Sequence, residues 1–303
     1  MSKKWLKVAL MVTAIATGTS IQVDAETVLY VPQDDRPVSL QYTVDTAKAA
    51  GMTVLTPPQN LISGKTYKGQ ADQIWNWVEQ NAGRADVMVL STDTLIYGGL
   101  VDSRKHNLPL STLENRLKRI EALKANHKNT RIYGFGTVMR SPRASGGGTE
   151  PSYYADYGPT IFQIAALQDK LDAGTLTQAE TQKLMSLQAS VPVEYLQDWF
   201  SRRQKNMQVN KDLIDEARNG VFAYFALGHD DTSQLSQSAL EGRYLNQYSK
   251  GIPRTQYGSF PGADQLGLLL MARSRTDEST EKPTFSVIYP LGGGGKTLPG
   301  YED

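Results

Sequence analysis

Residues 86–91 read Asp-Val-Met-Val-Leu-Ser (DVMVLS), a short run dominated by apolar residues. Helical patterns flank this run on both sides, at 70–81 and at 111–126. In the second pattern leucine and isoleucine recur at helical spacing, and Ser111 with Glu114 predicts a capping box. A buried strand between two helices is the repeating unit of a parallel α/β fold.

The same alternation continues in both directions from this strand. Further strands are expected at 27–32, 52–56, 131–138, 221–227 and 284–291. These runs are apolar along their length, as parallel strands buried on both faces are. Right-handed βαβ units therefore predict a parallel sheet, arranged either as an open, doubly wound sheet or as a (β/α)-barrel-like closure.

One long segment interrupts the alternation. It covers about residues 142–220 and carries helical patterns at 161–173 and 177–189, so we interpret it as a helical insertion. An insertion after a strand can cover an active site, and structural elaboration explains it equally well. No helix follows the expected strand at 284–291, so we expect the fold to be incomplete at the C-terminus.

Residues 1–25 have the three parts of a cleavable signal peptide. The start carries the lysines Lys3, Lys4 and Lys7. A short apolar run at 8–16 follows, and Val-Asp-Ala at 23–25 fits the cleavage rule. We therefore expect a secreted or extracytoplasmic protein with a single α/β domain at 26–303.

Composition and charge narrow the classes of partner. The chain has no cysteine, which excludes disulfides and thiolate metal sites. Loss of the signal peptide removes three lysines and one aspartate, so the net charge changes from +1 to about −1. A nearly neutral chain has no general electrostatic attraction for nucleic acid. No other stretch is apolar for long enough to suggest a membrane span after signal cleavage.

Charged residues follow the strands at the edge where ligands bind in parallel α/β folds. The candidate catalytic residues are the strand-end aspartates Asp34, Asp35, Asp93 and Asp230. The candidate substrate-binding residues are Arg36, Tyr97, Arg104, Arg140, His229, Asp231 and Asp264. Any one aspartate after a strand also suits a helix cap or a turn, so the hypothesis depends on their convergence.

Two kinds of hydrolysis fit this set. A glycoside hydrolase needs one carboxylic acid and one carboxylate, and tyrosines near the loops can stack on sugar rings. A divalent-metal-dependent hydrolase would use aspartates with His229, the one histidine expected in a strand-end loop, whereas His106 and His127 fit surface positions. A divalent metal is thus the only cofactor suggested. A non-catalytic exported glycan-binding protein is the third alternative.

Adjacent side chains on an extended segment point in opposite directions. We therefore expect only one of Asp230 and Asp231 to enter the cleft, and Asp230 is the preferred one.

Four motifs occur in order along the chain: VPQDDRPV (31–38), STDTLIYGGLVDSR (91–104), GHDDT (228–232) and PGADQLGLLLMAR (261–273). Together they resemble the domain-of-unknown-function family numbered 4127, from about residue 27 to the end. The resemblance implies an exported bacterial protein that is generally longer than this chain. The family has no established activity, so it implies no catalytic residue and no cofactor.

Overall fold

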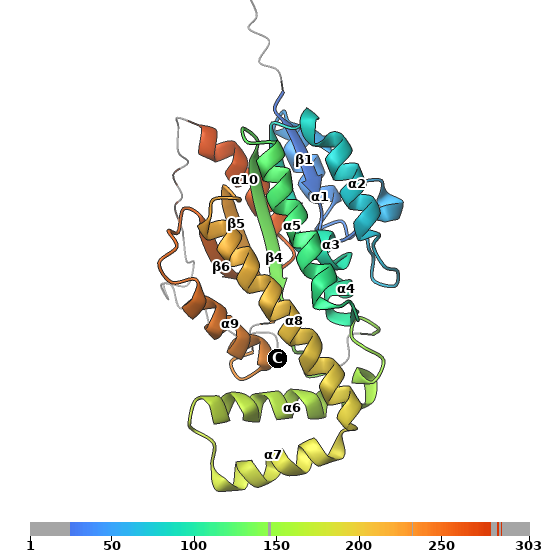
Figure 1. Cartoon of the computed structure of the whole chain (residues 1–303), viewed down its shortest axis with the longest axis vertical. Helices are drawn as coiled ribbons and strands as arrows, with labels where there is room; N and C mark the ends of the chain where they lie inside the picture. Colours follow the sequence, from blue (N-terminus) through green and yellow to red (C-terminus); the bar gives the residue numbers. More distant parts are fainter. Residues whose placement is uncertain (1–24, 145–146, 232, 280–283, 285, 287–303) are drawn as a thin grey trace, which may run out of the picture.

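The fold is built on one parallel sheet (Figure 1). A computed structural model describes residues 25–144, 147–231 and 233–279, together with Thr284 and Ser286. Its six strands lie in the order β2-β1-β3-β4-β5-β6, and every neighbouring pair is parallel. The strands are β1 (Thr27–Val31), β2 (Thr53–Leu55), β3 (Val87–Ser91), β4 (Arg131–Val138), β5 (Tyr224–His229) and β6 (Tyr257–Pro261).

Helices connect the strands and cover both faces of the sheet. They are α1 (Gln41–Ala49), α2 (Ala71–Asn81), α3 (Thr92–Tyr97), α4 (Leu100–Lys105), α5 (Leu110–Asn126), α6 (Tyr154–Asp172), α7 (Gln178–Ser190), α8 (Val193–Arg218), α9 (Gln237–Tyr248) and α10 (Leu266–Glu278). Two 3-10 turns, η1 (Gln59–Leu61) and η2 (Ala82–Arg84), complete the connections.

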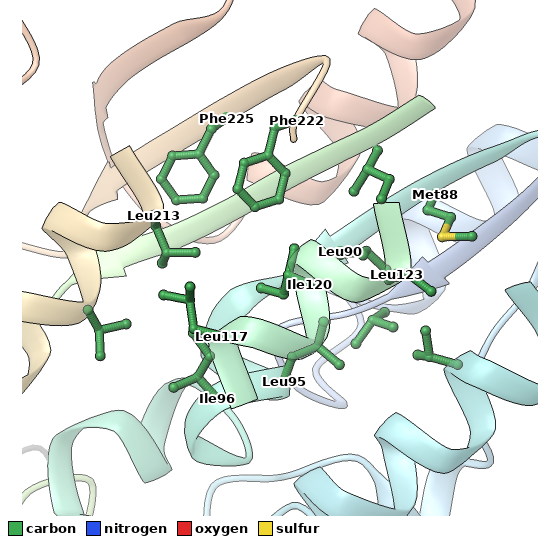
Figure 2. Close-up of a cluster of buried hydrophobic side chains, with 14 of the residues drawn as sticks. Met88, Leu90, Leu95, Ile96, Leu117, Ile120, Leu123, Leu213, Phe222 and Phe225 are labelled. Carbon is green, nitrogen blue, oxygen red and sulfur yellow. The ribbon is translucent and has the colours of Figure 1, made fainter. Parts of the chain in front are cut away.

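Two apolar clusters lie on opposite faces of the sheet. The larger one packs α2, α3, α5 and α8 on the sheet, and Figure 2 shows Leu117 and Ile120 of α5 beside Phe222 and Phe225. The smaller one packs Ala47 of α1 and residues of α10 on the other face. The sheet is therefore open and doubly wound, and the barrel alternative is wrong.

A third cluster forms where α6 and α7 leave the sheet. It joins these two helices to the first turns of α8 through residues such as Trp199. The later turns of α8 belong to the large cluster, through Leu213 and Ile214. Helix α8 therefore carries the α6–α7 pair on one end and forms the β4-to-β5 crossover with the other (Figure 1).

Most predicted elements agree with this fold, two points differ, and two predictions lie largely outside the described residues. The predicted strand at 284–291 lies largely outside the described residues, and the sixth described strand is Tyr257–Pro261, which the sequence analysis did not identify. The predicted capping box at Ser111 is wrong, because α5 begins after Pro109 and no side chain caps it. The predicted signal peptide lies outside the described residues up to residue 24. Within the described part, no helix is long and apolar enough to cross a bilayer.

The strand order places the topological switch point of the sheet between β1 and β3. The chain leaves β1 towards β2 on one side, while β3 leads to β4 on the other side. At such a point the loops after the two central strands diverge, and ligands of doubly wound sheets bind in the space between them. The carboxyl ends of β1, β3, β4, β5 and β6 therefore define the region to search for a site.

Candidate functional site

Hydrogen bonds join the segments that follow β1 and β3 at the switch point. Thr94 donates its hydroxyl to the carbonyl oxygen of Pro32 at 2.6 Å, which joins α3 to the loop after β1. Ser91 caps α3 by accepting the backbone N–H of Thr94 at 3.3 Å. Gly98 ends this short helix with a φ of 114°, a left-handed conformation that favours glycine.

Asp93 of α3 is buried and contacts the loop after β1 and strand β4. Its Oδ2 accepts hydrogen bonds from Gln33 Nε2 at 3.1 Å and from Thr137 Oγ1 at 2.8 Å. Burial raises the pKa of Asp93 to about 6, although the hydrogen bonds oppose this effect. The side chain is 2 % exposed, so it supports the site from beneath and does not line an open surface.

Arg36 connects two of the predicted carboxylates. Its Nε donates to Oδ2 of the buried Asp34 at 2.7 Å, and its Nη2 donates to Oδ1 of Asp264 at 2.8 Å. Asp264 is exposed and precedes α10. The loop after β1 is thereby tied to the loop after β6.

Asp230 follows β5 and forms an ion pair with Arg104 of α4. Burial raises the pKa of Asp230, the nearby charge of Asp264 raises it further, and the charges of Arg104 and Arg140 lower it. Burial also lowers the pKa of Arg104.

Glu150 extends this ion-pair network from the loop before α6. Arg140 Nε donates to Glu150 Oε1 at 2.8 Å, and Arg104 Nη1 lies 3.9 Å from the same oxygen. The two predicted arginines therefore hold carboxylates at the edge of the sheet.

Asp231 has a different environment from its neighbour. It is buried, and its two oxygens accept the backbone N–H groups of Ser141 at 3.1 Å and Ser233 at 2.9 Å. It therefore fixes the loops after β4 and β5 together, while Asp230 reaches the surface beside them.

A hollow of about 680 Å³, named here the acidic hollow, lies next to Asp230. Asp230 and Asp264 both line it, and Phe260, Leu266 and Leu269 provide apolar surface. The hollow thus combines two carboxyl groups with an aromatic ring and aliphatic side chains.

The other predicted residues are distributed more widely. Asp35 accepts a hydrogen bond from Tyr67 and lines a separate hollow of about 640 Å³ together with Trp77. The four predicted catalytic aspartates therefore do not share one hollow. Asp230 lines the acidic hollow, Asp34 adjoins it through Arg36, Asp93 is buried and Asp35 lies elsewhere.

Tyr97 and His106 do not lie where the sequence analysis expected them. Tyr97 is buried and stacks on His106 with ring centroids 4.9 Å apart, so it is a core residue and does not offer a face to a ligand. His106 is also buried, contrary to its predicted surface position, and its Nε2 lies 2.7 Å from Asn206 Oδ1. Burial lowers the pKa of His106 to about 4.

His229 ends β5 and contacts Ser259 of β6, with Nε2 and Oγ 2.7 Å apart. Burial lowers the pKa of His229. In the ranges that the structure describes, no three histidine or carboxylate side chains come together as metal ligands. The geometry therefore gives the metal-dependent alternative no supporting observation.

Sequence reasoning missed Gln33, Thr137, Glu150 and Ser259, which contact the predicted residues. Gln33 directly precedes the Asp-Asp pair, and its position was a usable signal. The other three lie inside strands or in the loop before α6, where a single polar residue has no distinctive pattern.

The resemblance found in the sequence is confirmed by comparison with known families. No curated protein and no solved structure matches this chain. Residues 28–303 match the family described as "Protein of unknown function (DUF4127)". The match begins at the second residue of β1 and includes the other five described strands and the acidic hollow. The chain belongs to this family.

Proposed function

We propose that the protein is a hydrolase acting on carbohydrate, similar in chemistry to glycoside hydrolases, and that the acidic hollow is its active site. The observation that supports this proposal is the pair Asp230 and Asp264, two carboxyl groups in different environments on one hollow. Glycoside hydrolysis requires two carboxyl groups with different roles, one that donates a proton and one that acts as nucleophile or base.

Asp230 suits the role of general acid. Burial raises its pKa, the charges of Arg104 and Arg140 lower it, and the charge of Asp264 raises it. The net shift is upward, which is the direction that a general acid needs. Its ion pair with Arg104 fixes the carboxyl group in position.

Asp264 suits the second role, as nucleophile or as base for an attacking water molecule. It is exposed, and Arg36 holds it by an ion pair. The neighbouring Phe260 and the leucines of α10 offer apolar surface for a sugar ring. If the predicted signal peptide directs export, the substrate class is a cell-envelope or environmental glycan.

A second candidate function is glycan binding without catalysis. It is favoured by the ion pairs themselves, because Asp230 and Asp264 each have an arginine partner already. A binding protein needs such groups fixed as hydrogen-bond acceptors, and it needs no proton transfer.

The test is release of reducing ends from a panel of polysaccharides and peptidoglycan, with glycan binding measured on the same panel. Asp230→Asn and Asp264→Asn should each abolish release. Asp169→Asn is the matched control for Asp230, since Asp169 is a buried carboxylate paired with Arg243. Asp72→Asn is the control for Asp264, since Asp72 is exposed and paired with Arg116.

Turnover that depends on both hollow aspartates and on neither control supports the hydrolase. Binding with the same dependence, but without turnover, supports the glycan-binding protein. Turnover that survives both Asp230→Asn and Asp264→Asn contradicts the assignment of the acidic hollow.

A further inference from the structure

A smaller hollow lies beside the acidic one and has different chemistry. Its volume is about 280 Å³, and its lining includes His229, Ser259, Gln234 and Asn246. Phe260 and Pro261 line both hollows, so the end of β6 separates them. We name the smaller one the serine hollow.

The register of the sheet brings His229 and Ser259 together. Ser259 pairs with Leu227 in the neighbouring strand, and side chains two residues apart in a strand point to the same face. Leu227, His229 and Ser259 therefore share one face of the sheet. The separation of 2.7 Å between Nε2 and Oγ is a hydrogen-bond distance.

A glycine in α9 provides the space for the imidazole. A Cβ atom at Gly242 would lie 2.5 Å from Cε1 and 2.9 Å from Nδ1 of His229. Any larger residue at this buried position would displace the ring from Ser259. The histidine is therefore confined on one side by α9 and hydrogen-bonded on the other side by the serine.

The immediate surroundings suit acyl transfer. Burial lowers the pKa of His229, which favours the neutral ring, and a neutral imidazole can accept a proton. Gln234 and Asn246 are exposed side chains on the same hollow, and their amide N–H groups can stabilise a negatively charged oxygen.

We propose that Ser259 and His229 form a nucleophile–base pair that hydrolyses esters of short acyl groups in the serine hollow. The small volume of the hollow and its adjacency to open solvent favour a short acyl chain such as acetyl. This inference does not rest on the proposed carbohydrate hydrolysis, because it uses none of the carboxylates of the acidic hollow.

The reaction balances with water as the only co-reactant. Ser259 Oγ attacks the ester carbonyl carbon while its proton passes to His229 Nε2. The C–O bond to the alcohol then breaks, and the alcohol leaves with that proton. Water attacks the acyl-serine, gives a proton to His229, and the acid leaves as the serine recovers its proton.

The experiment uses the full chain with p-nitrophenyl acetate as substrate and a fluorophosphonate as a covalent probe. The probe should attach to Ser259, located by mass spectrometry of the wild-type protein. Ser259→Ala should abolish labelling and lower ester hydrolysis about 100-fold or more. Ser233→Ala is the matched control, because Ser233 lines the same hollow and does not contact His229. This variant should keep both the labelling and the ester hydrolysis of the wild type.

His229→Gln separates catalysis from folding. Glutamine can still form a hydrogen bond with Ser259, but it cannot take a proton, so labelling should slow strongly while the thermal midpoint stays close to that of the wild type. Absence of labelling in the folded wild-type protein overturns the proposal. Attachment of the probe to any residue other than Ser259 also overturns it, and neither result depends on a variant that must fold.

Discussion

Arg36 Nη2 donates to Asp264 Oδ1 at 2.8 Å, a contact that joins residues 228 positions apart in the sequence. The same guanidinium binds Asp34, whose side chain is only 5 % exposed. One arginine therefore holds a buried carboxylate on one side and an exposed carboxylate of the acidic hollow on the other side.

This arrangement predicts that replacing Arg36 and replacing Asp264 lower the free energy of unfolding by different amounts. Arg36→Met should lower the free energy of unfolding by about 1–3 kcal/mol, because the buried Asp34 loses the partner of its charge. Asp264→Ala should cost about 0–1 kcal/mol, because its ion pair is exposed to solvent. Urea unfolding of both variants checks this, with Arg218→Met as control, because Arg218 and its partner Asp215 are both exposed. Equal costs for Arg36→Met and Asp264→Ala would contradict the role given to Arg36.

Asp93 predicts a pH dependence of stability. Burial raises its pKa to about 6 in the folded protein, above the ordinary value of 3.8. Between these two values the unfolded chain has lost this proton while the folded chain keeps it. The free energy of unfolding should therefore fall as the pH rises from about 4 to about 6, by about 3 kcal/mol, and this contribution should be constant above that range.

Asp93→Asn should remove that pH dependence. Both hydrogen bonds to Asp93 end on the same atom, Oδ2, and the oxygen of an asparagine can accept both. The variant should thus be more stable than the wild type at pH 7. Urea unfolding of both proteins at several pH values between 4 and 7 is the measurement. Parallel pH profiles for the two proteins would show that Asp93 is ionised in the fold over this range.

Much of the central sheet was predictable because buried parallel strands are apolar along their length. The segment 131–138 was identified with the boundaries of β4, and β1, β3 and β5 were identified with small errors. Strand β6 has the sequence Tyr-Gly-Ser-Phe-Pro, and its glycine, serine and proline conceal a strand whose place is set by pairing with β5. Propensity cannot identify a strand of that kind.

The sequence predicted which edge of the sheet carries the site. It did not predict which residues of the site contact one another. The rule for parallel strands located Asp34, Asp93 and Asp230 near the carboxyl ends, but it gives no direction for a side chain within a loop. Asp35 diverges towards Tyr67, and Tyr97 enters the core, because packing of the connecting segments decides both. The Ser259–His229 contact depends on the register between β5 and β6, which the sequence alone does not specify.

The contact between Gly242 and His229 predicts that one added methyl group at residue 242 disturbs the serine hollow. In Gly242→Ala the added Cβ would lie 2.5 Å from Cε1 of His229, so the ring must move away from Ser259. Fluorophosphonate labelling should fall to a small fraction of the wild-type rate. Stability should change little if the ring can move, because alanine favours the helix by about 1 kcal/mol.

The control for this variant is Gly83→Ala, since a Cβ there meets no atom within 4 Å. It should leave labelling unchanged. Wild-type labelling in Gly242→Ala would show that the position of the imidazole is not important, and the nucleophile–base pair would then lose its main geometric support.

Asp230 and Asp231 provide the sharpest comparison within the proposed active site, because neighbouring residues of one type have different surroundings. Asp230→Asn keeps the size of the side chain and removes the ionisable carboxyl group that pairs with Arg104. If Asp230 is the general acid, turnover should fall at least about 100-fold. The unfolding free energy should fall too, by about 1–3 kcal/mol, because Arg104 is left buried without its closest partner.

Asp231→Asn should have the opposite profile. The two oxygens of Asp231 accept the N–H groups of Ser141 and Ser233, and asparagine has only one such oxygen, so about 1 kcal/mol of stability should be lost. Turnover should stay within a few fold of the wild type, since this side chain does not line the acidic hollow. Reducing-end release and urea unfolding of both variants decide between the roles, because they measure chemistry and stability separately. Loss of turnover in Asp231→Asn with full turnover in Asp230→Asn would reverse the assignment, and full turnover in both would remove this loop from the proposed active site.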